Sequence, residues 1–257
     1  MSAFSLRRSG DWLHAAARLF AQKPFLLCAA ALLIFFLPKL LVVSLSKALN
    51  FPQPPYYFTP LLAQILWPFL LASMANLAVS ARYSFRGVVR PALECWQPLA
   101  GLALLLLCYA FLALRLLALM DPGFIHGLSQ DIVIITKPEH RAPLLRLLLL
   151  FLPFFMAQWF TPLLIVWRRC PLGKALFFNF AAIGRNWLGI LLLVLLSNTL
   201  TAGVFYQIRF VSSAALRLLL ACWLMLALIA FWVCLLVALY RDFFPAGEKT
   251  AHISERA

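Results

Sequence analysis

Acidic residues are scarce in this chain. Its 257 residues include 8 Asp and Glu against 22 Lys and Arg, which gives a net charge of +14. None of the acids falls deep within a long apolar segment. Proton relays in membrane proteins normally need an Asp or Glu inside a span. The sequence therefore argues against a proton-coupled pump, but it leaves facilitated transport and lipid movement open.

The signature motifs of common enzymes are also missing. The sequence has no GxSxG, P-loop or HExxH motif and no pair of carboxylates within an apolar segment. Its 6 cysteines lie within or beside apolar segments, without a CxxC pair or a histidine at metal-binding spacing. We interpret them as small apolar residues. The sequence therefore predicts a protein that is not an enzyme and that has no cofactor and no metal.

Charge of either sign is sparse. Charged residues make up 12% of the chain and hydrophobic residues 65%, with a mean hydropathy of +0.95, whereas a soluble domain is about 25% charged. In a soluble protein the excess cations would suggest nucleic acid. Here they are scattered at the ends of apolar segments, where lipid phosphates are the nearest counter-charge. We therefore expect membrane lipids as partners, and no nucleic acid. Other membrane proteins and the oligomeric state stay open.

Six apolar segments are each long enough to cross a bilayer. A hydrocarbon core about 30 Å thick needs about 20 helical residues. The segments fall at 24–48, 59–81, 97–120, 143–168, 187–209 and 216–241. No linker between them is long enough for a separate soluble domain. The sequence therefore predicts an all-α fold, a polytopic transmembrane helical bundle with about six spans over residues 24–244.

The cations are divided unequally between the two ends of these spans. Of the 22, 14 flank the ends that share a side with the termini, namely Arg7, Arg8, Arg18, Lys23, Arg82, Arg86, Arg90, Arg168, Arg169, Lys174, Arg185, Arg241, Lys249 and Arg256. Lys and Arg in short loops are retained on the cytoplasmic side. We therefore expect a multi-pass bacterial inner-membrane protein. Its N-terminal segment (1–23) and its tail (245–257) should both be cytoplasmic.

A short amphipathic segment precedes the first apolar segment. Its polar face carries Asp11, His14, Arg18 and Gln22, and its other face carries Trp12, Ala16, Leu19 and Phe20. This pattern predicts an interfacial helix, with Asp11 placed to cap its start. Similar segments at 90–96 and 172–180 also precede a short break and an apolar span. The spacing predicts three copies of a unit that joins an interfacial helix to a transmembrane hairpin.

A second group of cations lies near the opposite ends of the spans. It consists of Lys39, Arg115, Arg146, Arg209 and Arg217. At about 1.5 Å per residue, each lies roughly 24 Å or more from the inner end of its helix, level with the outer headgroups. These side chains either anchor the protein on lipid phosphates by snorkelling or recognise an anionic lipid or solute.

Polar residues within the spans are the candidates for lining a cavity. They are Asn76, Gln158 and Asn198. Small residues share the stretches of Asn76 and Asn198, which also favours close packing between helices. The outer loop 121–142 contains His126, Asp131, Glu139 and His140, whose spacing matches no metal site. We interpret that loop as solvated, and whether it binds anything stays open.

Three short motifs carry a resemblance. They are Trp12 with Leu19-Phe20 and Pro24, then Arg185-Asn186-Trp187-Leu188, and then Tyr240-Arg241-Asp242-Phe243-Phe244. With these motifs the chain resembles a family of uncharacterised six-span proteobacterial inner-membrane proteins. In layout it is distantly similar to the membrane domain of some bacterial glycerophosphodiester phosphodiesterases, whose catalytic domain has no counterpart here. The resemblance implies the topology and brings no activity or catalytic residues.

These patterns favour a protein that binds or organises lipids or membrane partners. The cations, the amphipathic segments and the missing catalytic motifs point in this direction. The alternative is a small transporter or lipid translocator. That alternative is suggested by the repeat and by prolines within the spans, which kink helices. These prolines are Pro38, Pro68, Pro153 and Pro162.

Overall fold

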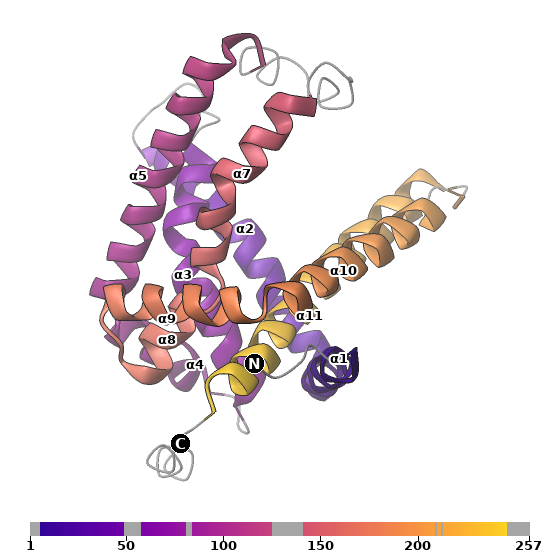
Figure 1. Ribbon diagram of the computed structural model, residues 1–257. Coiled ribbons are helices and arrows are strands. Elements are labelled where there is room, and N and C mark those ends of the chain that lie inside the picture. The colour runs from indigo at the N-terminus through magenta and orange to yellow at the C-terminus, as the bar shows by residue number, and fades with distance from the viewer. Residues whose placement is uncertain are drawn as a thin grey trace.

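The computed structural model describes residues 6–48, 58–80, 84–124, 141–208, 210–211 and 213–245. Within these ranges the protein is an all-α helical bundle (Figure 1). In chain order the helices are α1 (Leu6–Gln22), α2 (Pro24–Ala48), α3 (Phe58–Val79), α4 (Phe85–Glu94), α5 (Trp96–Met120), α7 (Arg141–Gln158), α8 (Thr161–Arg168), α9 (Leu172–Arg185), α10 (Trp187–Ile208) and α11 (Ala214–Phe243). The expected fold class is confirmed. Most of the outer loop 121–142 and the tail beyond Pro245 lie outside the described residues.

Five helical segments are long and apolar enough to cross a membrane. They are Leu62–Val79, Trp96–Met120, Ala142–Arg168, Trp187–Ile208 and Ala214–Phe243. A sixth passes the same test when Arg8–Gln22 and Pro24–Leu33 are taken as one broken segment, bent by 88°. The described helices are therefore compatible with a protein embedded in a membrane by five or six spans.

Helix α1 is amphipathic as expected, but it begins earlier than expected. Trp12 and Ala16 are buried, while Asp11 and Arg18 are exposed. The prediction that Asp11 caps the helix is wrong, because α1 already begins at Leu6. The added turn is held by tertiary contacts, since Ser9 is buried and Arg8 forms an ion pair with α11. Contacts between distant segments override a local capping preference here.

Two more amphipathic helices occupy equivalent places in the chain. Helices α1, α4 and α9 are each followed by one intervening residue, Lys23, Cys95 or Asn186, and then by a long apolar helix. The first residues of those apolar helices include exposed aromatics, namely Phe25, Trp96 and Trp187. Exposed aromatics at such positions are typical of a membrane–water interface. The order expected for the repeat thus occurs three times in the described part of the chain.

The packed core lies at the end of the bundle that contains α1, α4, α8 and α9 (Figure 1). Helix α8 is its most enclosed element, with Thr161–Val166 all buried. Helix α11 contributes the buried run Val233–Tyr240 and packs against α1, α2 and α3. The α5–α7 and α10–α11 hairpins extend away from this core in different directions and expose apolar side chains. We call the end with the packed core the core end.

An ion pair joins the turn between α8 and α9 to the end of α4. The Arg169 guanidinium lies 2.7 Å from a Glu94 carboxylate oxygen and donates to the Cys95 sulfur at 2.8 Å. The hydrogen bond from Arg169, and to a smaller extent the one from Arg90, holds the pKa of the Glu94 carboxyl below its usual value. Arg169 has a φ of 50°, in the left-handed region that non-glycine residues seldom adopt. The contacts with α4 therefore stabilise the turn between α8 and α9.

A buried asparagine repairs the break between α7 and α8. The Phe160 backbone N–H donates to Asn179 Oδ1 at 3.0 Å, and Asn179 Nδ2 donates to the Met156 carbonyl at 2.8 Å. Asn179 is fully buried on α9. Backbone groups freed by a break need partners because little water reaches a buried core. Asn179 therefore allows α8 to turn inside the core.

We expect Asn179→Ala to lower the free energy of unfolding by about 1–3 kcal/mol, the cost of a buried donor left without a partner. Unfolding by SDS titration in mixed micelles measures this change. The matched control is Asn198→Ala, because Asn198 is exposed and donates only to Val194 of its own helix. Equal effects of the two substitutions would contradict the proposed role of Asn179.

Candidate functional site

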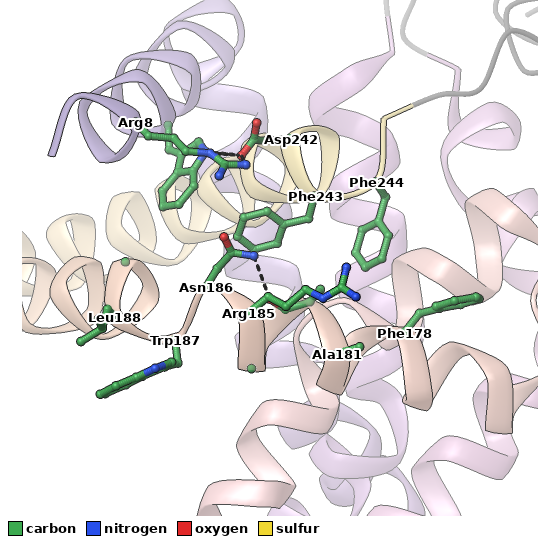
Figure 2. Close-up of a pocket in the computed structure, with 14 residues that line it drawn as sticks. Arg8, Phe178, Ala181, Arg185, Asn186, Trp187, Leu188, Asp242, Phe243 and Phe244 are labelled. Carbon is green, nitrogen blue, oxygen red and sulfur yellow. Dashed lines mark hydrogen bonds and ion pairs between the residues drawn. The ribbon is translucent and has the colours of Figure 1, made fainter. Parts of the chain in front are cut away.

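A cavity of about 1060 Å³ lies where α1, α9, α10 and the end of α11 meet (Figure 2). We call it the junction cavity. Its charged and amide lining residues are Arg8, Arg185, Asn186 and Asp242. Large apolar residues, Trp12, Phe178, Trp187, Leu188, Phe243 and Phe244, form most of the remaining wall, which small residues complete. The cavity therefore combines a few charged groups with a largely apolar wall.

Small residues on α9 leave the space for this cavity. Ala181, Ala182 and Gly184 lie on its wall, and a Cβ added at Gly184 would have no atom within 4 Å. The chain then turns into α10 at Asn186, whose N–H donates to the Ile183 carbonyl at 3.1 Å. Asn186 Nδ2 donates to the Ala182 carbonyl at 2.9 Å. The turn is thus fixed by local hydrogen bonds, and the Asn186 side-chain oxygen takes no hydrogen bond from the described residues.

Asp242 attaches α1 to the end of α11. Its Oδ2 atom lies 2.7 Å from Arg8 Nη2 and accepts a hydrogen bond of 2.9 Å from Trp12 Nε1. The Trp12 ring also makes an edge contact with Phe243, with 5.5 Å between centroids. Figure 2 shows Arg8 turned toward Asp242 at the cavity edge. The Oδ1 atom of Asp242 takes no hydrogen bond from any residue that the structure describes.

Arg185 is the last residue of α9, and its guanidinium has no hydrogen-bond or ion-pair partner among the described residues. Figure 2 shows it extending toward Phe244. Arg168, in contrast, donates to the Phe244 and Pro245 carbonyls at 2.9 and 2.8 Å. Arg8 and Asp242 offset one another, so Arg185 leaves the cavity lining with an excess of positive charge. The arrangement favours a ligand with an anionic group and an apolar part.

The cations near the opposite ends of the spans, which we call the outer cations, are Lys39, Arg115, Arg146, Arg209 and Arg217. The three of them whose side chains the structure describes are not gathered into one site. Arg146 forms a two-point contact with Asp121 at 2.7 and 2.9 Å, and the Arg115 guanidinium lies 5.1 Å from the Phe111 ring centroid. Arg217 is exposed near the start of α11. The tips of the two hairpins lie apart in Figure 1. The side chains of Lys39 and Arg209 lie outside the described residues, so the role of this group stays a prediction.

The three amides proposed for a cavity have separate environments. Asn76 is buried, donates to the Val88 carbonyl at 3.0 Å and accepts from Trp167 Nε1 at 2.6 Å, which joins α3 to α4 and α8. Gln158 lies beside the α7–α8 break, and its buried Nε2 has no partner among the described residues. Asn198 is exposed on α10. None of the three lines the junction cavity.

Sequence reasoning missed the residues that line the junction cavity. It used Arg8 only as a marker of orientation, Arg185 as such a marker and as part of a motif, and Asp242 only as part of a motif. The three motifs that carry the family resemblance converge here, through Trp12, 185–188 and 242–244. Asp242 offered a signal, because it is one of few acids and directly follows an apolar span. The convergence itself could not be foreseen from segments so far apart in sequence.

Comparison with known proteins adds no relative for this site: no protein-family model, curated protein or solved structure matches the chain. The described residues also contain no group of three His, Cys, Asp or Glu side chains that could hold a metal ion. The chemistry of the junction cavity therefore has to be interpreted from its own geometry and charge.

Proposed function

We propose that this chain is an integral membrane protein that binds an anionic phospholipid and holds the headgroup in the junction cavity. The supporting observation is Arg185, a cation without a partner among the described residues, in a cavity with an excess positive charge. Arginine binds phosphate through parallel charge-assisted hydrogen bonds. Aromatic side chains beside it suit the boundary between headgroups and acyl chains.

Helix α10 offers a place for the acyl chains. Trp187 and Leu188 line the cavity, and the exposed apolar surface continues along the same helix through Leu191, Leu192 and Leu195. A lipid with its phosphate at Arg185 can lay its chains on this surface. Such contacts depend on close packing, because lipid tails are as apolar as leucine and no hydrophobic driving force remains within a bilayer. The continuity of cationic cavity and apolar helix face supports a lipid over a free phosphate.

We further propose that the protein lies in a bacterial inner membrane with its termini in the cytoplasm, so that the lipid comes from the inner leaflet. Helices α4, α8 and α9 meet at the core end of the bundle. These helices and the turn between α8 and α9 carry Arg90, Arg168, Arg169, Lys174 and Arg185. Cation-rich ends are retained in the cytoplasm. Anionic lipid in that leaflet attracts the same cations.

A reporter fused to the C-terminus tests this orientation. Green fluorescent protein should fluoresce there, and alkaline phosphatase should be inactive because its disulfides form only outside the reducing cytoplasm. Fusions after Met120, beyond the third span, should give the opposite result and serve as the control. Phosphatase activity from the full-length fusion would contradict the orientation.

Arg185→Gln should weaken binding of an anionic phospholipid about tenfold or more, because a hydrogen bond to a charged group contributes about 1.5–3 kcal/mol. Native mass spectrometry of protein released from gentle detergent measures the bound fraction. Arg146→Gln is the matched control, since it removes the same charge from the opposite end of the bundle. Loss of lipid with Arg146→Gln but not with Arg185→Gln would move the site to the outer cations.

Filling the cavity provides a second test. A leucine at Gly184 projects into open space, so Gly184→Leu should displace the lipid without disturbing the fold. Gly173→Leu is the control, because Gly173 lies on the same helix, also has open space around its Cβ position, and does not line the cavity. The free energy of unfolding of both variants should be at least that of the parent protein, since leucine has a higher helix propensity than glycine. Full lipid retention by Gly184→Leu would exclude the junction cavity as the binding site.

A further inference from the structure

We infer that the junction cavity selects a phosphodiester lipid whose headgroup carries one negative charge and free hydroxyl groups, as a glycerol headgroup does. This inference rests on the proposed lipid-binding function and names the class of headgroup. It is motivated by the acceptor atoms in the cavity, which a simple anion-binding site would not contain.

Asp242 supplies a negatively charged acceptor on the cavity wall. A carboxylate beside an anion site repels phosphate unless its charge is offset. Here Arg8 and Trp12 both donate to Oδ2, so the carboxylate is offset in charge and held in one orientation. Its Oδ1 atom takes no hydrogen bond from the described residues. An ionised carboxylate can only accept. A ligand that displaces water from this oxygen loses a hydrogen bond unless it supplies a donor of its own.

Asn186 supplies a second, neutral acceptor. Its Nδ2 group is used by the Ala182 carbonyl, so the side-chain oxygen remains as an acceptor on the cavity wall. Together, Asn186 and Asp242 offer acceptor oxygens on the lining of one cavity, whereas Arg185 offers donors. A glycerol headgroup has complementary groups, with a phosphate that accepts from arginine and hydroxyls that donate to these oxygens.

The charge of the cavity lining limits the charge of the headgroup that fits it. With Arg8 and Asp242 offset, Arg185 contributes one unbalanced positive charge to the lining. A phosphodiester with an uncharged polyol balances it. A phosphomonoester carries about −1.5 to −2 near neutral pH, which leaves excess negative charge beside Asp242. A zwitterionic headgroup leaves the positive charge unbalanced. The singly charged, hydroxylated phosphodiester therefore fits best.

The test compares two lipids of equal charge in nanodiscs that contain the full chain. Phosphatidylglycerol carries hydroxyls on its headgroup and phosphatidylethanol carries none. By native mass spectrometry, the protein should retain phosphatidylglycerol about tenfold more strongly, as expected for a hydroxyl bound to a charged acceptor. Equal retention of both lipids would overturn the headgroup inference while leaving the proposed function intact. Retention of neither would overturn the proposed function.

Two variants distinguish the two roles of the Asp242 carboxylate, as an acceptor for the headgroup and as the ion-pair partner that attaches α1. Asp242→Ala should lower the preference several-fold, because the charged acceptor is lost and only the neutral Asn186 oxygen remains. Arg8→Ala breaks the same ion pair but keeps the carboxylate, so the preference should persist even if total binding falls. Loss of the preference in both variants would overturn the direct role of the carboxylate. Soluble glycerophosphoglycerol bound as tightly as the whole lipid would overturn a membrane lipid as the occupant.

Discussion

Backbone hydrogen bonding at helix breaks governs this structure. The chain interrupts its helices at Lys23, Cys95, 159–160 and Asn186, where the terminal N–H and C=O groups need partners. Side chains supply them. Asn179 serves the α7–α8 break, and Lys23 donates to the carbonyls of Leu77 and Ser80 at the end of α3. These breaks allow α1, α4 and α9 to leave the direction of the spans and assemble the core end.

The junction cavity is a consequence of the same breaks. Helix α9 ends at Arg185, and one residue later α10 begins, so the end of a cationic helix adjoins the start of an apolar one. Helix α1 closes one side through Arg8, Trp12 and Asp242. The exposed ion pair alone contributes little, about 0–1 kcal/mol. The buried Trp12 ring, packed on Phe243, supplies the apolar contact that keeps α1 in place.

Much of the architecture was predictable, because membrane spans leave strong local signals. The segments predicted at 24–48 and 97–120 agree with α2 and α5 to within a residue. The polar and apolar faces of α1 follow from 3.6-residue periodicity. The start of α1 was misplaced because Arg8 and Ser9 are ordered by contacts with distant residues. The role of Asn179 was equally hidden, since its sequence neighbours mark only an amphipathic helix.

The sequence by itself determined the all-helical class, the apolar helices and the unequal distribution of cations, because each depends on local composition and on the length needed to cross a bilayer. Only the tertiary structure decided which cations are paired and which are not. Arg146 meets Asp121, whereas Arg185 meets no described partner. It also decided that residues near positions 8, 185 and 242 share one cavity. Such proximity depends on how helices pack in three dimensions, which charge and periodicity along a single chain do not specify.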